Sequence, residues 1–412
     1  MTRHERTVDV LVVGGGPAGL GAGAELAASG AGRVEILERE QTAGGVPRHC
    51  AHGGFGDRIP VLGGGTTGPA YARDCVAAAV RSGAVLRTGV TVTGWAGPLT
   101  VDTTAPTGLE RITARAVVLA TGARERPRSA RLVPGSRPPG VYTTGELQQA
   151  VHLYRQRIGT RAVVIGDEPV GRAAVDTLRV AGADVVAVVT DRPHSRLAAL
   201  TRSGDRPPVL DDTTVTGLTG RERLTGVEVR HRDGRTTTLR CDTVVFTGDW
   251  IPDHELARRG AITLDPGTRG PAYDAAHRTT RNGVFAVGNL LHGVESAAFA
   301  AAEGRAVAAP LLRHLATGAW PEGRPPVTVA APLSWIAPNL VGPDGDTPPH
   351  DRFSLRTTRR LSAPLLVARQ DGRVLHRQRL LRPAVPGLPF HLRADWLDRV
   401  DPGGGTVRIE AN

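Results

Sequence analysis

Two glycine-rich turns carry the residues whose types and spacing could bind a nucleotide. Gly14, Gly16 and Gly19 form the pattern G-x-G-x-x-G, directly after an apolar run at 8–13 and at the start of a helical stretch. The first glycine permits a tight turn, the second lets the backbone approach a pyrophosphate, and the third lets helix and strand pack closely. Glu38 lies 19 residues beyond Gly19, where its carboxylate can accept the hydroxyls of an adenosine ribose. The first turn therefore predicts a dinucleotide site.

A second turn repeats this spacing but carries a carboxylate at its middle position. In "GDEPVG", Gly166 and Gly171 hold the first and third glycine positions, and Glu168 holds the second. A negative charge in this poorly solvated turn would repel a pyrophosphate. Arg172 follows four residues later, in the orientation that favours an i,i+4 ion pair on a helix. We predict that Glu168 occupies the anion position from within and pairs with Arg172.

The ribose position of the second turn also departs from that of the first. Counting 19 residues from Gly171 reaches Thr190, which is not an acid, and Asp191 comes one residue late. We therefore expect a standard NAD pose to be disfavoured. The alternative is a nucleotide held differently, for instance with Arg172 or Arg192 against its phosphates.

A third group of reactive side chains follows Gly45 in the stretch "VPRHCAHGGFG". His49, Cys50 and His52 are close neighbours there. One thiol without a resolving partner cannot run dithiol exchange. Three adjacent ligands with no evident fourth make a poor metal site, so we predict no metal. The stretch either packs as a purely structural segment or lines a redox cofactor with polar groups.

The composition argues against several classes of function. All 51 basic residues are arginine, spread beside 40 acids, so the net charge of +11 does not indicate a nucleic-acid partner. The longest uncharged apolar stretch, 10–24, is short and rich in glycine, which predicts no membrane span. Three scattered cysteines and an N-terminus without an apolar signal segment favour a cytoplasmic protein.

The elements that must position these residues form two copies of one plan. Each copy runs strand, glycine turn, helix, strand and then a returning buried strand, at 115–122 in the first copy and 241–250 in the second. A last strand and a long helix follow at 282–315, before short strands with a two-residue turn at Asp371-Gly372. We predict an α/β fold with two Rossmann-like domains and a small β-rich C-terminal domain. The predicted ranges are 1–126 and 251–318 for the first domain, 127–250 for the second and 325–412 for the third.

The first turn in this context resembles the two-dinucleotide-domain flavoproteins, which include glutathione-reductase-like and ferredoxin-reductase-like enzymes. The resemblance covers about residues 8–316 and implies a glutathione-reductase-like fold with FAD in the first site. In "VFAVGN", Asn289 replaces the aspartate that usually meets the ribityl chain, and an amide can still bond a ribityl hydroxyl. The residues that the resemblance places at FAD are Gly14, Gly16, Gly19, Glu38, Arg39, Gly44, Gly45, Ala120, Thr121, Gly122, Gly288 and Asn289.

In such a flavoprotein the stretch after Gly45 lies beside the flavin. We name His49 and Cys50 as candidate catalytic residues that tune the flavin potential or pass protons. Arg48 would steady a reduced flavin anion.

Three stretches, "GGVPRHCAHGGFG", "ATGARERPR" and "VVFTGDWIPDHELA", resemble more narrowly the FAD subunits of multi-subunit amine and imino-acid dehydrogenases. These include dye-linked proline dehydrogenase, opine oxidase, hydrogen cyanide synthase and heterotetrameric sarcosine oxidase. The resemblance implies that a separate flavoprotein subunit oxidises the substrate and that this chain relays electrons. No cysteine follows Cys241, so an iron-sulfur cluster would come from a small partner protein. In this family the second domain can carry NAD(P) or ATP, which keeps a second nucleotide open.

Two other functions remain as alternatives. One is a stand-alone NAD(P)H-dependent flavin reductase, which Glu168 counts against. The other is a non-catalytic flavoprotein that scaffolds a complex.

Overall fold

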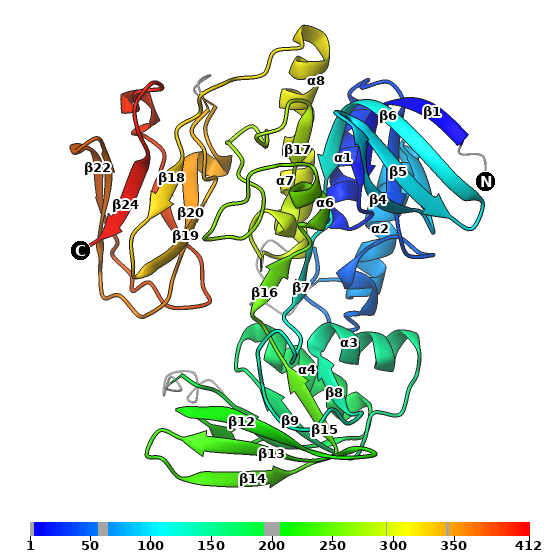
Figure 1. The fold of residues 1–412 in the computed structure, drawn as a ribbon, viewed down its shortest axis with the longest axis vertical. Helices are drawn as coiled ribbons and strands as arrows, with labels where there is room; N and C mark the ends of the chain where they lie inside the picture. The colour runs from blue at the N-terminus through cyan, green and yellow to red at the C-terminus, as the bar shows by residue number, and fades with distance from the viewer. Residues whose placement is uncertain (1–3, 57–64, 193–206, 294, 343–345) are drawn as a thin grey trace.

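The computed structural model describes residues 4–412 apart from 57–64, 193–206, 294 and 343–345. These residues form two Rossmann-like units and a C-terminal β-rich unit (Figure 1). In this view the first Rossmann unit and the C-terminal unit lie side by side above the second Rossmann unit. The predicted α/β fold class is confirmed. Across the described ranges we find no helix that is long and apolar enough to cross a membrane.

The first Rossmann unit is built on a seven-stranded sheet in the order β3-β2-β1-β6-β5-β4, with β17 added beside β6. The pairs around β1 are parallel, whereas β4, β5 and β6 form an antiparallel meander. The carboxyl half of β1 is buried on both faces, which explains its continuous apolar run. The strands are β1 (His4–Val13), β2 (Val34–Glu38), β3 (Val85–Thr88), β4 (Thr91–Gly97), β5 (Thr100–Ala105), β6 (Gly108–Leu119) and β17 (Val284–Ala286).

Helices of the first unit pack closely through small residues. A side chain at Gly304 on α7 would overlap the carbonyl oxygen of Ala18 on α1, so the two helix backbones lie in direct contact. The predicted single long helix is in fact two, α7 and α8, because Pro310 has no N–H to continue the helical ladder and its ring crowds the preceding turn. The helical segments are α1 (Pro17–Ala28), α2 (Gly68–Arg81), α6 (Glu255–Arg259), α7 (Ala297–Ala306), α8 (Ala308–Thr317), η1 (Val46–His49) and η4 (Gly288–Leu290).

The second Rossmann unit has a five-stranded parallel sheet in the order β11-β10-β9-β15-β8 beside a three-stranded antiparallel sheet, β12-β13-β14. α3 begins with a capping box formed by Thr143 and Glu146 and runs on into the π-helical turn η3. The strands are β8 (Val141–Thr143), β9 (Arg161–Ile165), β10 (Asp184–Val189), β11 (Val209–Leu210), β12 (Thr213–Gly220), β13 (Leu224–His231), β14 (Thr236–Arg240) and β15 (Thr243–Phe246). The helical segments are α3 (Thr144–Gln148), η3 (Gln149–Leu153) and α4 (Pro169–Val180).

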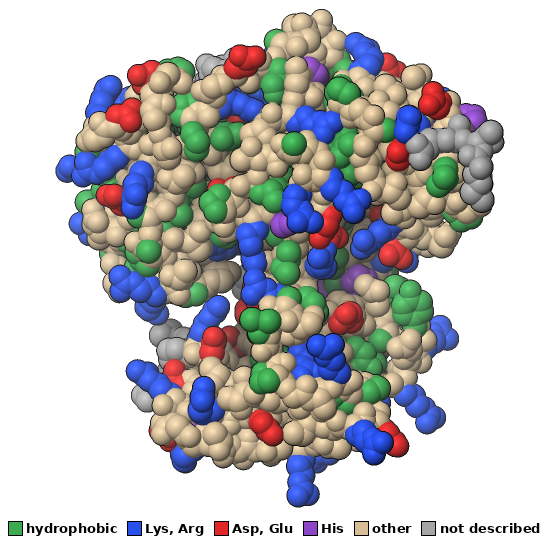
Figure 2. Space-filling view, in the orientation of Figure 1, with side chains coloured by type: hydrophobic (Ala, Val, Ile, Leu, Met, Phe, Trp, Pro, Cys, Tyr) green, Lys and Arg blue, Asp and Glu red, His purple; other side chains and the backbone are tan. Residues whose placement is uncertain are grey.

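Two chain segments connect the Rossmann units. β7 (Ala123–Glu125) leaves the first unit and β16 (Trp250–Pro252) returns to it, and they pair as a short antiparallel ribbon. Figure 2 shows the molecule narrowing at this level, with arginine side chains around the narrow part. The chain thus crosses between the two units in both directions at this ribbon.

The C-terminal unit stacks two sheets, β18-β24-β21-β22 and β19-β20-β23, around a core that contains Phe353 and Trp396. The predicted two-residue turn is confirmed, since Asp371 and Gly372 both have positive φ and join β21 to β22. The elements are β18 (Val327–Val329), β19 (Leu333–Ala337), β20 (Arg352–Thr357), β21 (Leu365–Gln370), β22 (Arg373–Arg379), β23 (Phe390–Arg393), β24 (Val407–Ala411), η5 (Pro349–Asp351) and η6 (Leu397–Arg399).

Candidate functional site

The first glycine turn forms an open cradle at the start of α1. A side chain at Gly14 would overlap the carbonyl oxygen of Ala120, and one at Gly19 would overlap that of Gly14. At Gly16, by contrast, an added Cβ would meet only the Cα of Gly45, at 3.9 Å. The helix starts without a side-chain cap, so its first N–H groups are available to an anion. The space in front of Gly16 fits a pyrophosphate.

Glu38 is fixed at the edge of this cradle by the backbone. It ends β2 and is buried, and its carboxylate accepts hydrogen bonds from the N–H of Gly15 at 3.0 Å and of Glu40 at 2.8 Å. The neighbouring Arg39 is exposed, with its guanidinium 4.0 Å from the Asp253 carboxylate. The carboxylate is thus held beside the glycine turn, where the ribose of a dinucleotide would follow its phosphates.

Two further glycine segments close around the first turn. The Gly44 N–H donates to the carbonyl oxygen of Gly15 at 2.7 Å, and a Cβ on Gly45 would lie 2.9 Å from the Cα of Gly16. On the return strand, the Thr121 hydroxyl donates to the carbonyl oxygen of Asp253 at 2.7 Å. Gly122 follows with positive φ. The glycines brought together here are distant in sequence but share one surface.

Asn289 is held by a reciprocal pair of hydrogen bonds. Its Oδ1 accepts from the Glu295 N–H at 3.1 Å, and its Nδ2 donates to the Glu295 carbonyl oxygen at 3.2 Å. Gly288 has positive φ, and a Cβ there would lie 2.5 Å from that of Ala18 on α1. A carboxylate at 289 could accept but not donate, which gives a physical reason for asparagine here. A primary amide has a second N–H that can donate a hydrogen bond as well.

His49 and Cys50 are buried and uncharged at neutral pH. Burial raises the pKa of the Cys50 thiol to about 12, and the charge of Glu125 adds to this shift. Burial lowers the pKa of His49 to about 4, helped by the charges of Arg48 and His152. A thiolate–imidazolium pair is therefore disfavoured, and these residues offer neutral polar groups instead.

Cys50 contacts the second Rossmann unit directly. Its Sγ lies 3.3 Å from Oε1 of Gln148 on α3 and 3.4 Å from the carbonyl oxygen of Val46. The sequence pattern did not reveal this role of Gln148, because no local signal links positions 98 residues apart.

Glu125 is a second residue that no motif in the sequence singled out. It is buried on β7, and its carboxylate accepts the N–H of Gly145 at 2.9 Å and of Gly248 at 3.0 Å. Burial raises its pKa, against the opposing effect of these donors. The one signal that could have found it was a charged residue inside the "ATGARERPR" stretch.

The second glycine turn has a backbone like that of the first, but the side chain of Glu168 fills it. A side chain at Gly166 would overlap both the Thr247 hydroxyl and the Glu168 carboxylate. Glu168 is the N-terminal cap residue of α4, yet its side chain makes no capping bond. Its carboxylate turns back over Gly166 and accepts a hydrogen bond from Thr247 Oγ1 at 2.9 Å.

The predicted pairing of Glu168 with Arg172 is wrong. No ion pair joins these two described residues, because the carboxylate points towards the end of β15 while Arg172 is exposed. Arg131 lies on the β15 side and donates to the carbonyl oxygens of Thr247 and Gly248. Burial lowers the pKa of Arg131, and nearby carboxylates including Glu168 oppose that shift.

The ribose end of the second turn is polar but differs from Glu38. The Thr190 hydroxyl lies 3.4 Å from the carboxylate of Asp167, while the side chain of Asp191 is exposed beside Arg192. In the first turn, by contrast, two backbone N–H groups hold the Glu38 carboxylate.

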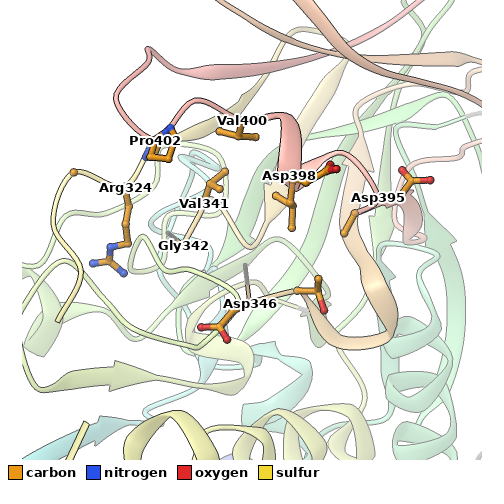
Figure 3. A pocket seen from close by; sticks show the side chains of 13 residues that line it. Arg324, Val341, Gly342, Asp346, Asp395, Asp398, Val400 and Pro402 are labelled. Atoms are coloured by element: carbon orange, nitrogen blue, oxygen red, sulfur yellow. The ribbon is translucent and has the colours of Figure 1, made fainter. Parts of the chain in front are cut away.

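A cavity of about 630 Å³ lies on the C-terminal unit, away from both turns (Figure 3). Three charged residues of its lining form ion pairs. Asp346 pairs with Arg278 at 3.1 Å, and Asp395 pairs with Arg393 at 3.1 Å. Arg324 pairs with Asp274 at 2.8 Å. The candidate site is therefore the first glycine cradle, where the geometry leaves space and free donors.

The family that shares this architecture can be identified from the sequence. A model described as "Pyridine nucleotide-disulphide oxidoreductase" matches residues 8–304. The chain belongs to this family. It is an FAD-dependent oxidoreductase, and the residues of the first cradle fit the pyrophosphate and ribose of that cofactor.

Curated relatives in this family are components of oxidases. The alpha subunit of sarcosine oxidase from Rhizobium meliloti (strain 1021) is 29% identical over 260 residues, 60% of this chain and 25% of that protein. Its counterpart from Corynebacterium sp. (strain P-1) is 29% identical over 366 residues, 81% of this chain and 36% of that protein. The opine oxidase A subunit of Agrobacterium tumefaciens (strain Ach5) is 35% identical over 167 residues, 39% of this chain and 32% of that protein. The chain thus spans about a quarter to a third of these relatives' lengths.

Two solved structures share the fold. Thioredoxin reductase of T. acidophilum has a TM-score of 0.62 at 23% identity, covering 76% of this chain and 100% of that chain. L-Proline dehydrogenase of P. horikoshii has a TM-score of 0.57 at 19% identity, covering 77% of this chain and 57% of that chain. The predicted resemblance to amine and imino-acid dehydrogenase subunits is confirmed by these matches.

This member of the disulphide oxidoreductase family has no paired cysteines among the residues that the structure describes. Cys50, Cys75 and Cys241 are all free thiols.

Proposed function

We propose that this chain is the flavin electron-transfer subunit of an amine or imino-acid dehydrogenase or oxidase complex. The observation that carries the proposal is the contrast between the two glycine turns. The first is open at Gly16, and the second is filled by Glu168. A chain that held FAD, disfavoured NAD(P)H and used no dithiol would need another electron donor, and a partner subunit would supply one. The names of the curated relatives, which are subunits of larger oxidases, support this.

The first cradle would hold FAD through groups with distinct tasks. Gly14, Gly16 and Gly19 bring the N-terminus of α1 to the pyrophosphate, and Glu38 accepts the ribose hydroxyls. Bound FAD would supply the two-electron acceptor of the reaction. The remaining assigned contacts are Arg39, Gly44, Gly45, Ala120, Thr121, Gly122, Gly288 and Asn289.

His49 and Cys50 would line the flavin end of the site as neutral groups. Their pKa shifts favour a polar surface that tunes the potential over a nucleophile or a charged acid. Arg48 is the nearest cation in sequence and would offset negative charge on reduced flavin.

The partners would be a small iron-sulfur protein and a substrate-oxidising flavoprotein subunit. If an iron-sulfur cluster takes part in the reaction, it would come from a partner, because the three thiols of this chain cannot supply four cluster ligands. The three free thiols suit a reducing compartment such as the cytoplasm. The domains of this subunit would be 1–126 with 251–318 for FAD, 127–250 for the second nucleotide-binding fold and 325–412 for the β-rich unit.

A stand-alone NAD(P)H-dependent reductase is the second candidate. One observation favours it: Gly166 and Gly171 keep the backbone shape of a nucleotide turn. Rotation of Glu168 away from Thr247 would reopen that turn to NAD(P) or ATP.

Anaerobic reduction of the purified, FAD-loaded chain separates these candidates. We expect little flavin bleaching with NADH, NADPH or an amine alone, and rapid bleaching once an amine is added together with the subunit that oxidises it. Rapid bleaching of the isolated chain by NADH or NADPH would instead establish the reductase.

A further inference from the structure

The loop between η4 and α7 is contacted by the C-terminal unit. Arg356 on β20 places its Nη2 3.0 Å from Oε1 of Glu295, and both side chains are largely buried. The backbone of the same Glu295 forms the reciprocal hydrogen bonds with Asn289. One ion pair therefore joins the β-rich unit to the residue that holds the turn assigned to FAD.

A second contact reaches the same loop beside the first. The guanidinium carbon of Arg356 lies 5.1 Å from the ring centroid of Trp335 on β19. That ring stacks on His292 at 5.9 Å between centroids, with an interplanar angle of 24°. His292 in turn bonds Glu303 on α7 at 2.9 Å. The C-terminal unit thus contacts the loop at two residues. Arg356 binds Glu295, and Trp335, which Arg356 covers, stacks on His292.

The buried ion pair is poorly explained by stability alone. Burial lowers the pKa of Arg356, and the charge of Glu295 opposes the shift. The other terminal nitrogen of Arg356, Nη1, is buried without a hydrogen-bond partner. Such a pair is costly to desolvate, and apolar side chains often stabilise a fold as well. An apolar pair, however, would not orient the Glu295 backbone as a directional ion pair does.

We propose that the C-terminal β-rich unit positions the FAD-contacting turn, with Arg356 acting through Glu295 on Asn289. Arg356 is a positioning residue, since it acts through the loop. The inference rests on the proposed assignment of Gly288 and Asn289 to FAD. The C-terminal unit would then help to shape the flavin site, because one of its sheets carries both Arg356 and Trp335, the two residues that contact the loop.

Two variants separate the ion pair from the surrounding packing. Glu295→Gln keeps the shape of the side chain and the backbone groups that Asn289 uses, but removes the charge that Arg356 binds. Arg356→Lys keeps the charge but loses the planar group that covers Trp335. The matched control is Gln370→Leu, because Gln370 is buried in β21 and its side chain bonds Asp401 and Gly405, two described residues of the C-terminal unit.

The measurements are the FAD dissociation constant of flavin-stripped protein, the visible spectrum and midpoint potential of bound flavin, and the thermal unfolding midpoint. We expect Glu295→Gln and Arg356→Lys each to weaken FAD binding about 3- to 30-fold and to change the spectrum or potential. The double variant should cost less than the sum of the two. Gln370→Leu should lower the unfolding midpoint and leave the flavin measurements unchanged.

Two results would overturn the inference in different ways. If both loop variants bind FAD as wild type does, with the same spectrum and potential, the ion pair is only structural and the FAD assignment stands. The same conclusion holds if they change only as the Gln370→Leu control does. If wild-type protein itself takes up no FAD, the proposed site is wrong and the inference falls with it.

Discussion

At the residue scale, the two glycine turns differ in what their middle position leaves free. Gly14 and Gly19 are required by packing, because any side chain would overlap a carbonyl oxygen. An added Cβ at Gly16 would have one neighbour within 4 Å, the Cα of Gly45 at 3.9 Å, so packing alone does not require glycine there. The two kinds of glycine can therefore be told apart by mutation.

Gly16→Glu should fold but lose FAD. The added carboxylate has room within the protein but lies against the pyrophosphate, so we expect affinity to fall by at least about 100-fold. The free energy of unfolding of the apoprotein should change by no more than about 1 kcal/mol. Flavin absorbance after purification and chemical denaturation measure the two effects. Gly19→Ala is the contrasting control and should destabilise the fold itself. A Gly16→Glu protein that retained full flavin would refute the assignment.

Glu168 should exclude nucleotides from the second turn. Glu168→Gly removes both the bulk and the charge, and we expect affinity for NADH, NADPH or ATP to rise roughly 5- to 150-fold, about 1 to 3 kcal/mol. Glu168→Gln keeps a group that can accept the Thr247 hydrogen bond and isolates the part due to charge. Calorimetric titration of the three proteins decides the matter. Micromolar binding by wild type, with no gain in Glu168→Gly, would show that the carboxylate tolerates or assists the nucleotide.

At the element scale, the loop before α7 combines polar pairs with buried apolar side chains such as Leu291. Asn289 bonds Glu295, and the buried pair of His292 and Glu303 joins the loop to α7. Burial alone would lower the pKa of His292, but the Glu303 charge and hydrogen bond outweigh it and raise the pKa. The residue types in this loop are therefore tied to donor and acceptor roles.

Asn289→Asp should weaken this loop, although aspartate is the residue usual in the resembling class. A carboxylate cannot donate to the Glu295 carbonyl oxygen and would face it with a like partial charge. We expect a loss of about 1 to 3 kcal/mol in the free energy of unfolding, together with faster hydrogen exchange at the start of α7. Asn289→Ala serves as the reference for simple removal of both bonds. An aspartate variant as stable as wild type would show that these bonds contribute little.

At the scale of the whole molecule, buried polar contacts between distant residues join the three units. Cys50 and Gln148 join the two Rossmann units, Glu125 holds the connecting ribbon, and Arg356 joins the C-terminal unit to the flavin loop. His49 lies beside the contact between the Rossmann units, where His152 of η3 faces it. The protonation state of His49 should therefore affect the stability of the whole folded chain.

His49 should make the protein less stable in acid. Its pKa falls from 6.5 to about 4 on folding, so the unfolded chain binds a proton more readily and stability falls as pH decreases. The free energy of unfolding has its full value above pH 6.5 and falls progressively between pH 6.5 and 4. The total loss is about 3 kcal/mol. Urea denaturation of wild type and His49→Gln at several pH values measures the difference. Equal acid sensitivity in both proteins would contradict this role.

The sequence alone determined the parts of the molecule that depend on neighbouring residues. The first turn, Glu38 and the hairpin at Asp371-Gly372 follow from local spacing, since strand, turn and helix there are continuous in the chain. Local reasoning also found the carboxylate at the second turn but gave it the wrong partner. An i,i+4 rule offered Arg172, whereas the fold brought Thr247, 79 residues away, closer to the carboxylate.

Only the tertiary structure decided which distant polar groups meet. Gln148 beside Cys50, Gly145 and Gly248 at Glu125, and Arg356 at Glu295 come from elements whose separation along the chain carries no pattern. Their positions depend on how whole sheets and units pack, because a side chain a few ångströms out of place finds no hydrogen bond. The sequence thus specified where FAD could bind, and the packing of the three units specified which residues hold that site in shape.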